Sequence, residues 1–336
     1  MLLMNAEFAP DPKVSKLYKP LSVRLGGITW LNPFRIFLLF AVTTCSISFA
    51  LEANFGTPLH FSYTLGVCAY LTELHKRLLD KLQPVLTLDS AQFEEERYRL
   101  DHYPRYQFIG AVCLGLPIMI LVNWSNTELQ GVLDGNQPSA AFLWKALIAA
   151  LNWIVVLQVL VIATSNTLRF CSLARKHTRV ELMDIDSLAP FTNMGVSTIL
   201  LFVGGYTILP LAIIINIDLL GPTILVLLVT LPIAIVLMLL PIESIRLKIR
   251  TKKDKEIELI TRGIQGDVTA IHQTKLAKEA DTVSTSNLIL YRDVVQNVSE
   301  RPFNNSHLRR LIVYIIIPIC AWLASSLSEH LLESTL

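Results

Sequence analysis

Charged side chains are scarce in this sequence. They make up 17% of its 336 residues, whereas soluble proteins average about 25%. The central thirds of its long apolar runs contain no charged residue at all. Ion-coupled carriers usually need carboxylates at such positions, so this class of transporter loses support. The net charge is only +2, which gives no indication of a nucleic-acid partner.

Cysteines and catalytic motifs are few as well. The five cysteines lie far apart in sequence, which disfavours a disulfide framework or a zinc site. The sequence has no zinc-binding His-Glu-x-x-His helix, no glycine-rich phosphate loop and no Gly-x-Ser-x-Gly elbow. We therefore expect no enzymatic activity, no cofactor and no metal.

Long apolar runs are what the sequence does contain. Apolar residues are 52% of the chain, and a helix needs roughly 20 of them to cross a bilayer core. Six runs meet this requirement: Phe34–Leu51, Gln107–Trp124, Phe142–Ser165, Gly195–Asn216, Gly221–Ile242 and Leu308–Leu327. The sequence therefore predicts an all-α polytopic transmembrane bundle.

A seventh run, Pro58–Leu74, is weaker because it contains several polar residues, His60 and Glu73 among them. If it crosses, the bundle has seven spans, and all Lys and Arg residues except Lys145 lie on one side. If it does not, six spans remain and the basic residues of the N-terminal segment move to the other side. Basic flanks stay cytoplasmic during insertion. We therefore favour seven spans, an N-terminus inside and a C-terminus outside, in a multi-pass protein of the cell membrane.

This topology divides the chain into segments. Residues 1–33 form a cytoplasmic N-terminal segment, and residues 34–242 form the bundle with cytoplasmic loops 75–106 and 166–192. Residues 243–307 form a cytoplasmic helical region, and residues 308–336 form the final span and a short outer tail. The basic residues of 169–179 lie at the level of the lipid headgroups, where anionic lipids would attract them.

The cytoplasmic segments carry helical patterns. Asp89, with Gln92 three residues later, fits a capping box at the start of a helix. Apolar residues recur at helical spacing beyond Ile242, with basic residues between them, as far as Ile264. The sixth run therefore continues as a helix into the cytoplasm, and a second amphipathic helix is expected over Leu288–Val298. Such apolar stripes pack either on each other or on a neighbouring subunit, and the second alternative predicts a homo-oligomer.

The last run carries an uncharged polar face and is our candidate site. Its residues are Tyr314, Pro318, Ala321, Ser325 and Ser328. Small residues permit close helix packing, and the same face would also suit the lining of a weakly polar pore. Other uncharged polar positions lie at Asn152 and Gln158 in the third of these six runs, and at Gly204–Tyr206 in the fourth.

Two stretches carry a resemblance. The segment Pro241-Ile-Glu-Ser-Ile-Arg-Leu-Lys-Ile-Arg, with Lys255-Glu256-Ile-Glu258-Leu259 after it, resembles a span end in uncharacterised prokaryotic multi-span membrane proteins. Arg301-Pro302-Phe303, Leu308-Arg309-Arg310, Ile317-Pro318 and Trp322 resemble the C-terminus of the same group, although its usual Trp before Pro-Phe is Arg301 here. The layout of seven spans with an inner helical anchor is also similar to that of insect chemoreceptor channels.

These observations favour an oligomeric ion channel or channel-like receptor. A small-molecule carrier and a non-catalytic scaffold or signalling protein are the alternatives. The channel is favoured because the spans lack buried charges and the last span has a polar face.

Overall fold

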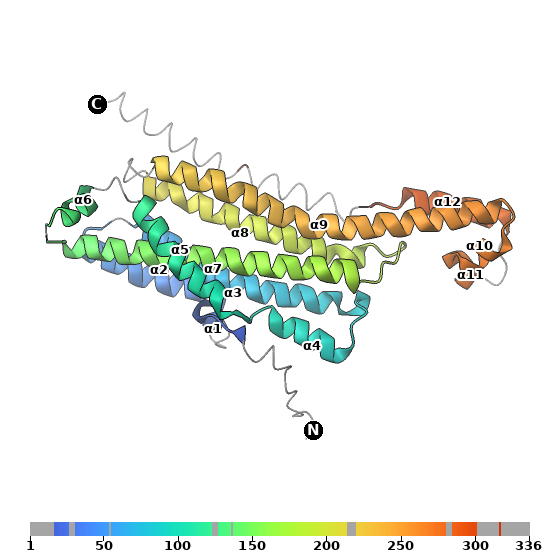
Figure 1. The fold of residues 1–336 in the computed structure, drawn as a ribbon, viewed down its shortest axis with the longest axis horizontal. Coiled ribbons are helices and arrows are strands. Elements are labelled where there is room, and N and C mark those ends of the chain that lie inside the picture. Colours follow the sequence, from blue (N-terminus) through green and yellow to red (C-terminus); the bar gives the residue numbers. More distant parts are fainter. Residues whose placement is uncertain are drawn as a thin grey trace, which may run out of the picture.

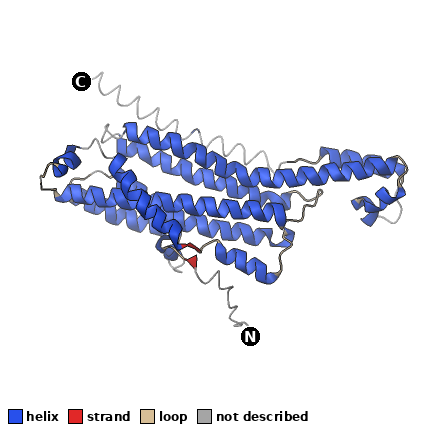
Figure 2. Cartoon of the chain, in the orientation of Figure 1, coloured by secondary structure: helices blue, strands red, loops and turns tan. Residues whose placement is uncertain are grey.

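The computed structural model describes residues 17–26, 31–53, 55–122, 127–135, 137–213, 220–279, 284–300 and 316. Almost all of this part of the chain is helical (Figure 2), and a single two-stranded sheet accompanies the helices. The predicted all-α architecture is therefore confirmed.

Six long helices form an elongated bundle, in which the third along the chain crosses the others obliquely (Figure 1). They are α2 (Pro33–Ala50), α3 (Gly56–Leu82), α5 (Arg105–Val122), α7 (Ala140–Lys176), α8 (Ala189–Ile213) and α9 (Leu220–Ile264). Short helices complete the described part of the fold: α1 (Leu21–Gly26), α4 (Ser90–Arg99), α6 (Thr127–Leu133), α10 (Val268–Gln273), α11 (Lys275–Glu279) and α12 (Thr285–Asn297).

Five helices in the described ranges are long and apolar enough to cross a membrane. They correspond to five of the six strong apolar runs, and the sixth, Leu308–Leu327, lies almost wholly outside the described residues. Large apolar side chains on α2 and α5 point outward: Phe49 is 76% exposed and Leu121 is 70% exposed. Exposing such apolar faces to water would be unfavourable, whereas contact with lipid chains is favourable.

Helix α3 contains the weak run Pro58–Leu74 and occupies the middle of the bundle. It packs against α2, α7 and α8, and most of its side chains are buried. Several of its polar residues bond within the helix, since the hydroxyl of Ser62 donates to the carbonyl of Pro58 at 2.8 Å and that of Thr72 to the carbonyl of Cys68 at 3.0 Å. Because protein covers α3 on most sides, it does not need a uniformly apolar surface.

Beyond the apolar part of the bundle, α9 continues as a long extension (Figure 1). It ends at Ile264, as its apolar stripe predicts. The side chains of Ile245, Ile249 and Ile260 are fully buried in a core that includes Leu288 and Val295 of α12. Residues of the same chain therefore cover the stripe, and a neighbouring subunit is not needed to bury it.

The predicted loops contain more helix than the sequence indicates. In segment 75–106, α3 runs on to Leu82 and α4 follows, with the predicted capping box of Asp89 and Gln92 confirmed. In segment 166–192, α7 continues to Lys176. The aromatic ring of Phe170 and its neighbours in α7 belong to the core that also buries the α9 stripe, which explains why α7 extends past its apolar run.

The N-terminal segment is attached to the chain between α4 and α5. Strand β1 (Leu17–Tyr18) pairs antiparallel with β2 (Tyr103–Pro104). The carboxylate of Asp101 lies 3.1 Å from the ammonium of Lys19 and 2.6 Å from that of Lys76. These contacts hold residues 17–19 and 101–104 together at one level of the bundle.

Candidate functional site

The candidate residues of the last apolar run, Tyr314, Pro318, Ala321, Ser325 and Ser328, lie outside the described residues. The pore lining that they would form stays a prediction. The bundle instead contains a pocket among helices that the structure does describe.

This bundle pocket has a cavity volume of about 120 Å³. It lies toward the end of the bundle where α3 begins, because His60, Tyr63 and Thr64 of its lining belong to the first turns of that helix. Residues of α3, α5, α7, α8 and α9 line it: His60, Tyr63, Thr64, Val67, Val122, Asn152, Trp153, Val156, Val159, Leu201, Phe202, Gly205, Tyr206 and Thr230.

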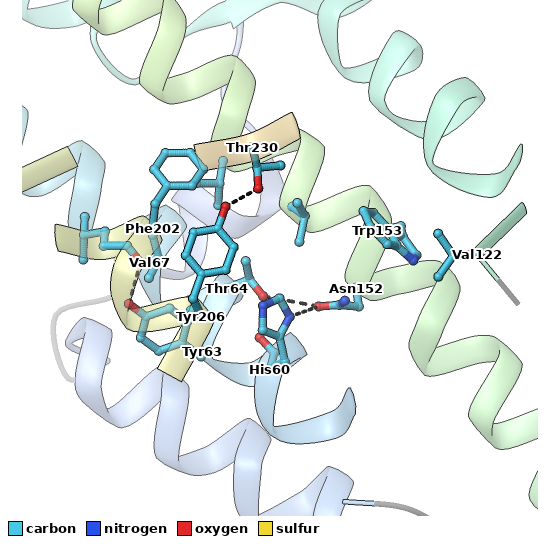
Figure 3. A pocket seen from close by; sticks show the side chains of 14 residues that line it. His60, Tyr63, Thr64, Val67, Val122, Asn152, Trp153, Phe202, Tyr206 and Thr230 are labelled. Carbon is cyan, nitrogen blue, oxygen red and sulfur yellow. Dashed lines mark hydrogen bonds between the residues drawn. The ribbon is translucent and has the colours of Figure 1, made fainter. Parts of the chain in front are cut away.

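The polar centre of the pocket is a contact between α3 and α7. Figure 3 shows the imidazole of His60 meeting the amide of Asn152, with Nδ1 and Oδ1 2.8 Å apart. The hydroxyl of Thr64 lies 3.4 Å from the same amide oxygen. Because Oδ1 accepts, a neutral His60 carries its proton on Nδ1 and leaves Nε2 as an acceptor. No described residue hydrogen-bonds to Nε2, nor to the NH₂ group of Asn152. The pair therefore offers one acceptor and one donor group to a guest.

Two tyrosines link α8 to its neighbours around the pocket. The hydroxyls of Tyr206 and Thr230 hydrogen-bond to each other between α8 and α9. The hydroxyl of Tyr63 donates to the carbonyl of Leu201 at 2.7 Å. A Cβ on Gly204 would overlap this Tyr63 hydroxyl, so the Tyr63 side chain can keep this position only because residue 204 has no side chain.

Gly205 has a different role, because it leaves space in the pocket. A Cβ at this position would lie 3.5 Å from Cε1 of Tyr63 and 3.6 Å from Nε2 of His60, which is ordinary van der Waals contact. A methyl group would therefore occupy pocket space without displacing either ring.

None of the fourteen lining residues is Asp, Glu, Lys or Arg. The described lining therefore has no charged partner for an ion, and an apolar wall surrounds its few hydrogen-bonding groups. Within the described ranges, no three His, Cys, Asp or Glu side chains lie close enough to hold a metal ion. The arrangement suits a small uncharged molecule with an apolar body and a hydrogen-bonding end.

The sequence indicates part of this pocket. Asn152, Gly205 and Tyr206 are among the uncharged polar positions within the apolar runs, and the structure brings them together. His60 and Thr64 were missed, because in the sequence they only weaken the case for a span. The signal available in the sequence was the set of polar residues within the weak run Pro58–Leu74. In the structure this run belongs to the central helix α3. Gln158, also noted in the sequence, does not line the pocket.

No family model, curated protein or solved structure matches this chain.

Proposed function

We propose that this protein is a channel-like membrane receptor whose bundle pocket binds a small uncharged molecule. The observation that carries the proposal is the His60–Asn152 pair, which presents a hydrogen-bond acceptor and donor in a pocket without formal charge. A charged ligand entering this pocket would lose its hydration without gaining an ionic partner. Removing an uncharged molecule from water costs much less free energy.

The cavity volume sets the size of the ligand. A protein cavity of roughly 150 Å³ holds one benzene molecule, and the bundle pocket measures about 120 Å³. Phenol is therefore a suitable probe, because its ring fits an apolar wall and its hydroxyl can both donate and accept. Toluene has almost the same shape without the hydroxyl.

The seven-span topology is part of the proposal. It is supported by the pairing of β1 with β2 and by the contact between Lys19 and Asp101. These contacts hold the N-terminal segment and the segment after α4 at the same level, with α2 and α3 between them in the chain. Two crossings return the chain to the side on which it started, whereas one crossing would separate the two segments. The basic residues of both segments make that side cytoplasmic.

Ligand binding can be tested on the purified protein in lipid nanodiscs. We expect phenol to raise the thermal unfolding temperature at lower concentration than toluene does. The hydroxyl should favour phenol by about five-fold in affinity, the value of one net hydrogen bond. Benzoate, which is similar in size but charged, should not bind.

Two variants and one control make the test specific. Gly205→Ala fills pocket space and should weaken the binding of both phenol and toluene. His60→Leu removes the acceptor and should abolish only the preference for phenol. Gly110→Ala is the control, because a Cβ there meets nothing within 4 Å. Equal binding of phenol by the wild type and Gly205→Ala would refute the pocket as its site.

Channel activity is a separate part of the proposal and needs its own experiment. Proteoliposomes should show conductance events that phenol modulates, and Ser325→Asp should alter ion selectivity if the last run lines the pore. Saturable phenol counterflow without conductance would instead identify a carrier. If phenol binds but neither activity occurs, the scaffold or signalling alternative remains.

A further inference from the structure

A second cavity lies where the α9 extension meets the connection between α7 and α8. We name it the extension cleft, and its volume is about 470 Å³. The described residues that line it come from four segments: Thr178–Leu182 in the connection, Lys248, Lys252 and Glu256 on α9, Gln273 and Lys275 around α10 and α11, and Tyr291 on α12. It is separate from the bundle pocket and shares no residue with it.

Basic side chains outnumber acidic ones in the cleft. Arg179, Lys248, Lys252 and Lys275 face two carboxylates, those of Glu181 and Glu256. Glu181 is shared, since it lies 3.3 Å from Arg179 and 3.7 Å from Lys275.

Lys248 and Lys252 have no carboxylate within ion-pair distance among the described residues. They lie one turn apart on the same face of α9. The ammonium of Lys248 donates to the carbonyl of Arg175 at 2.9 Å, and burial lowers its pKa below the usual lysine value. An anion in the cleft would offset both the burial and the repulsion between the neighbouring cations.

The carboxylate of Glu256 forms no ion pair with Lys248 or Lys252 among the described residues, and it is held instead by hydrogen bonds from other segments of the fold. One of its oxygens accepts the backbone N–H of Lys275 at 2.7 Å and lies 3.3 Å from the hydroxyl of Tyr291. The side chain is only 6% exposed. It therefore fixes the wall that carries Lys275 against α9, so that the cleft is shaped before any ligand arrives.

The distance from the bilayer indicates the source of the ligand. Counted from Ile242, the predicted end of the apolar run, α9 rises roughly 9 Å to Lys248, 15 Å to Lys252 and 21 Å to Glu256. The headgroup layer extends only roughly 5–7 Å beyond the hydrocarbon core on each side. Most of the cleft thus lies beyond the headgroups, within reach of dissolved anions.

From these contacts we infer that the extension cleft binds a phosphate-bearing anion, and that this anion is a soluble phosphate or phosphate ester. A doubly charged phosphate would match Lys248 and Lys252, for which the described part of the chain supplies no carboxylate partner. Lysines suit a phosphate group approached from several directions, because each acts as a point charge. The bound anion would join the α7–α8 connection to the α9 extension.

The test measures binding of inorganic phosphate and pyrophosphate by calorimetry. The full-length protein is placed in nanodiscs of phosphatidylcholine, which has no net charge. We expect saturable binding that weakens as salt rises, because the contacts are ionic. Lys252→Gln should weaken it by about ten-fold, and Lys248→Gln should also weaken it. Lys255→Gln is the matched control, because Lys255 lies on the same helix but not in the cleft.

A second arm separates the two sources of phosphate. The same proteins are placed in nanodiscs that contain phosphatidylglycerol, and the lipid that co-purifies is measured. Lipid retention that depends on Lys252, without phosphate binding in phosphatidylcholine, would overturn the soluble source and assign the cleft to a lipid headgroup. Equal phosphate binding by Lys252→Gln and Lys255→Gln, or no anion binding in either arm, would overturn the cleft as an anion site. Neither result depends on the bundle pocket.

Discussion

Asp101 shows how a single buried charge can connect distant segments. It is 3% exposed, and Lys19, Lys76 and His102 all contact its carboxylate. Burial by itself would raise the pKa of Asp101, but the hydrogen bonds from His102, Lys76 and Lys19 outweigh it and hold the pKa well below its usual value. The folded protein therefore favours the ionised form more strongly than the unfolded chain does.

This shift predicts an acid-dependent loss of stability. A carboxyl group whose pKa is depressed by folding contributes stability above its unfolded pKa of about 3.9, and that contribution disappears as the pH falls below it. We expect the thermal unfolding temperature of the wild type to fall more steeply below about pH 4 than that of Asp101→Asn. At neutral pH the variant should be the less stable of the two. Parallel pH profiles for the two proteins would contradict this role for Asp101.

A second buried network could not have been predicted from the sequence. Asn166 donates to Nδ1 of His75 at 3.0 Å and to the carbonyl of Leu100 at 3.2 Å, and its side-chain oxygen lies 3.2 Å from the hydroxyl of Tyr103. These residues come from α3, the end of α4, β2 and α7. Hydropathy and spacing describe each segment separately and contain no information about which segments come into contact. The His60–Asn152 pair is the same kind of feature, which is why the pocket was only partly foreseen.

At the scale of the helix, α8 and α9 approach each other closely at Gly195. A Cβ there would lie 3.2 Å from the carbonyl carbon and 3.3 Å from the Cα of Met238, and it would overlap the carbonyl oxygen. The obstacle is backbone, so it cannot rotate away. The two helices can keep this spacing only while residue 195 is glycine.

We therefore expect Gly195→Ala to destabilise the protein by about 1–3 kcal/mol, the usual cost of overpacking. Gly110→Ala introduces the same methyl group into α5, where nothing lies within 4 Å. It should leave stability within about 1 kcal/mol of the wild type, or raise it slightly through helix propensity. Thermal unfolding of both variants in the same detergent measures the difference. Similar unfolding temperatures would show that α8 and α9 can separate without cost.

Helices were predicted well where their own pattern determines them. The apolar runs of α2 and α5, the capping box of α4 and the end of α9 at Ile264 all follow from local sequence. The lengths of α3 and α7 do not follow from local sequence, because the final turns of these helices are stabilised by contacts in a shared core rather than by an apolar run. The partner of the α9 stripe was also undetermined, since an amphipathic face indicates burial but not the covering surface. In the structure α12 and the end of α7 cover it together.

At the scale of the whole molecule, basic residues and backbone pairing both favour the proposed seven-span topology, and they do so independently. The flanks of the spans place Lys and Arg on one side, which is a property of insertion. The β1–β2 pair and the Lys19–Asp101 contact place the N-terminal segment beside the chain that follows α4, which is a property of folding. If α3 did not cross the bilayer, the chain would fit neither the distribution of basic residues nor the β1–β2 pairing.

Cysteine labelling in intact cells tests this topology at three positions. In a variant whose five native cysteines are replaced, Asp134→Cys should react with a membrane-impermeant maleimide from outside. Gln265→Cys, just after α9, and Leu21→Cys, on α1 with the native Leu21 68% exposed, should react only after permeabilisation. Labelling of Gln265→Cys in intact cells would reverse the orientation derived from charge. If Leu21→Cys and Asp134→Cys react in intact cells but Gln265→Cys does not, α3 does not cross the bilayer. The N-terminal segment could then not pair with Tyr103–Pro104, because the two would lie on opposite sides of the bilayer.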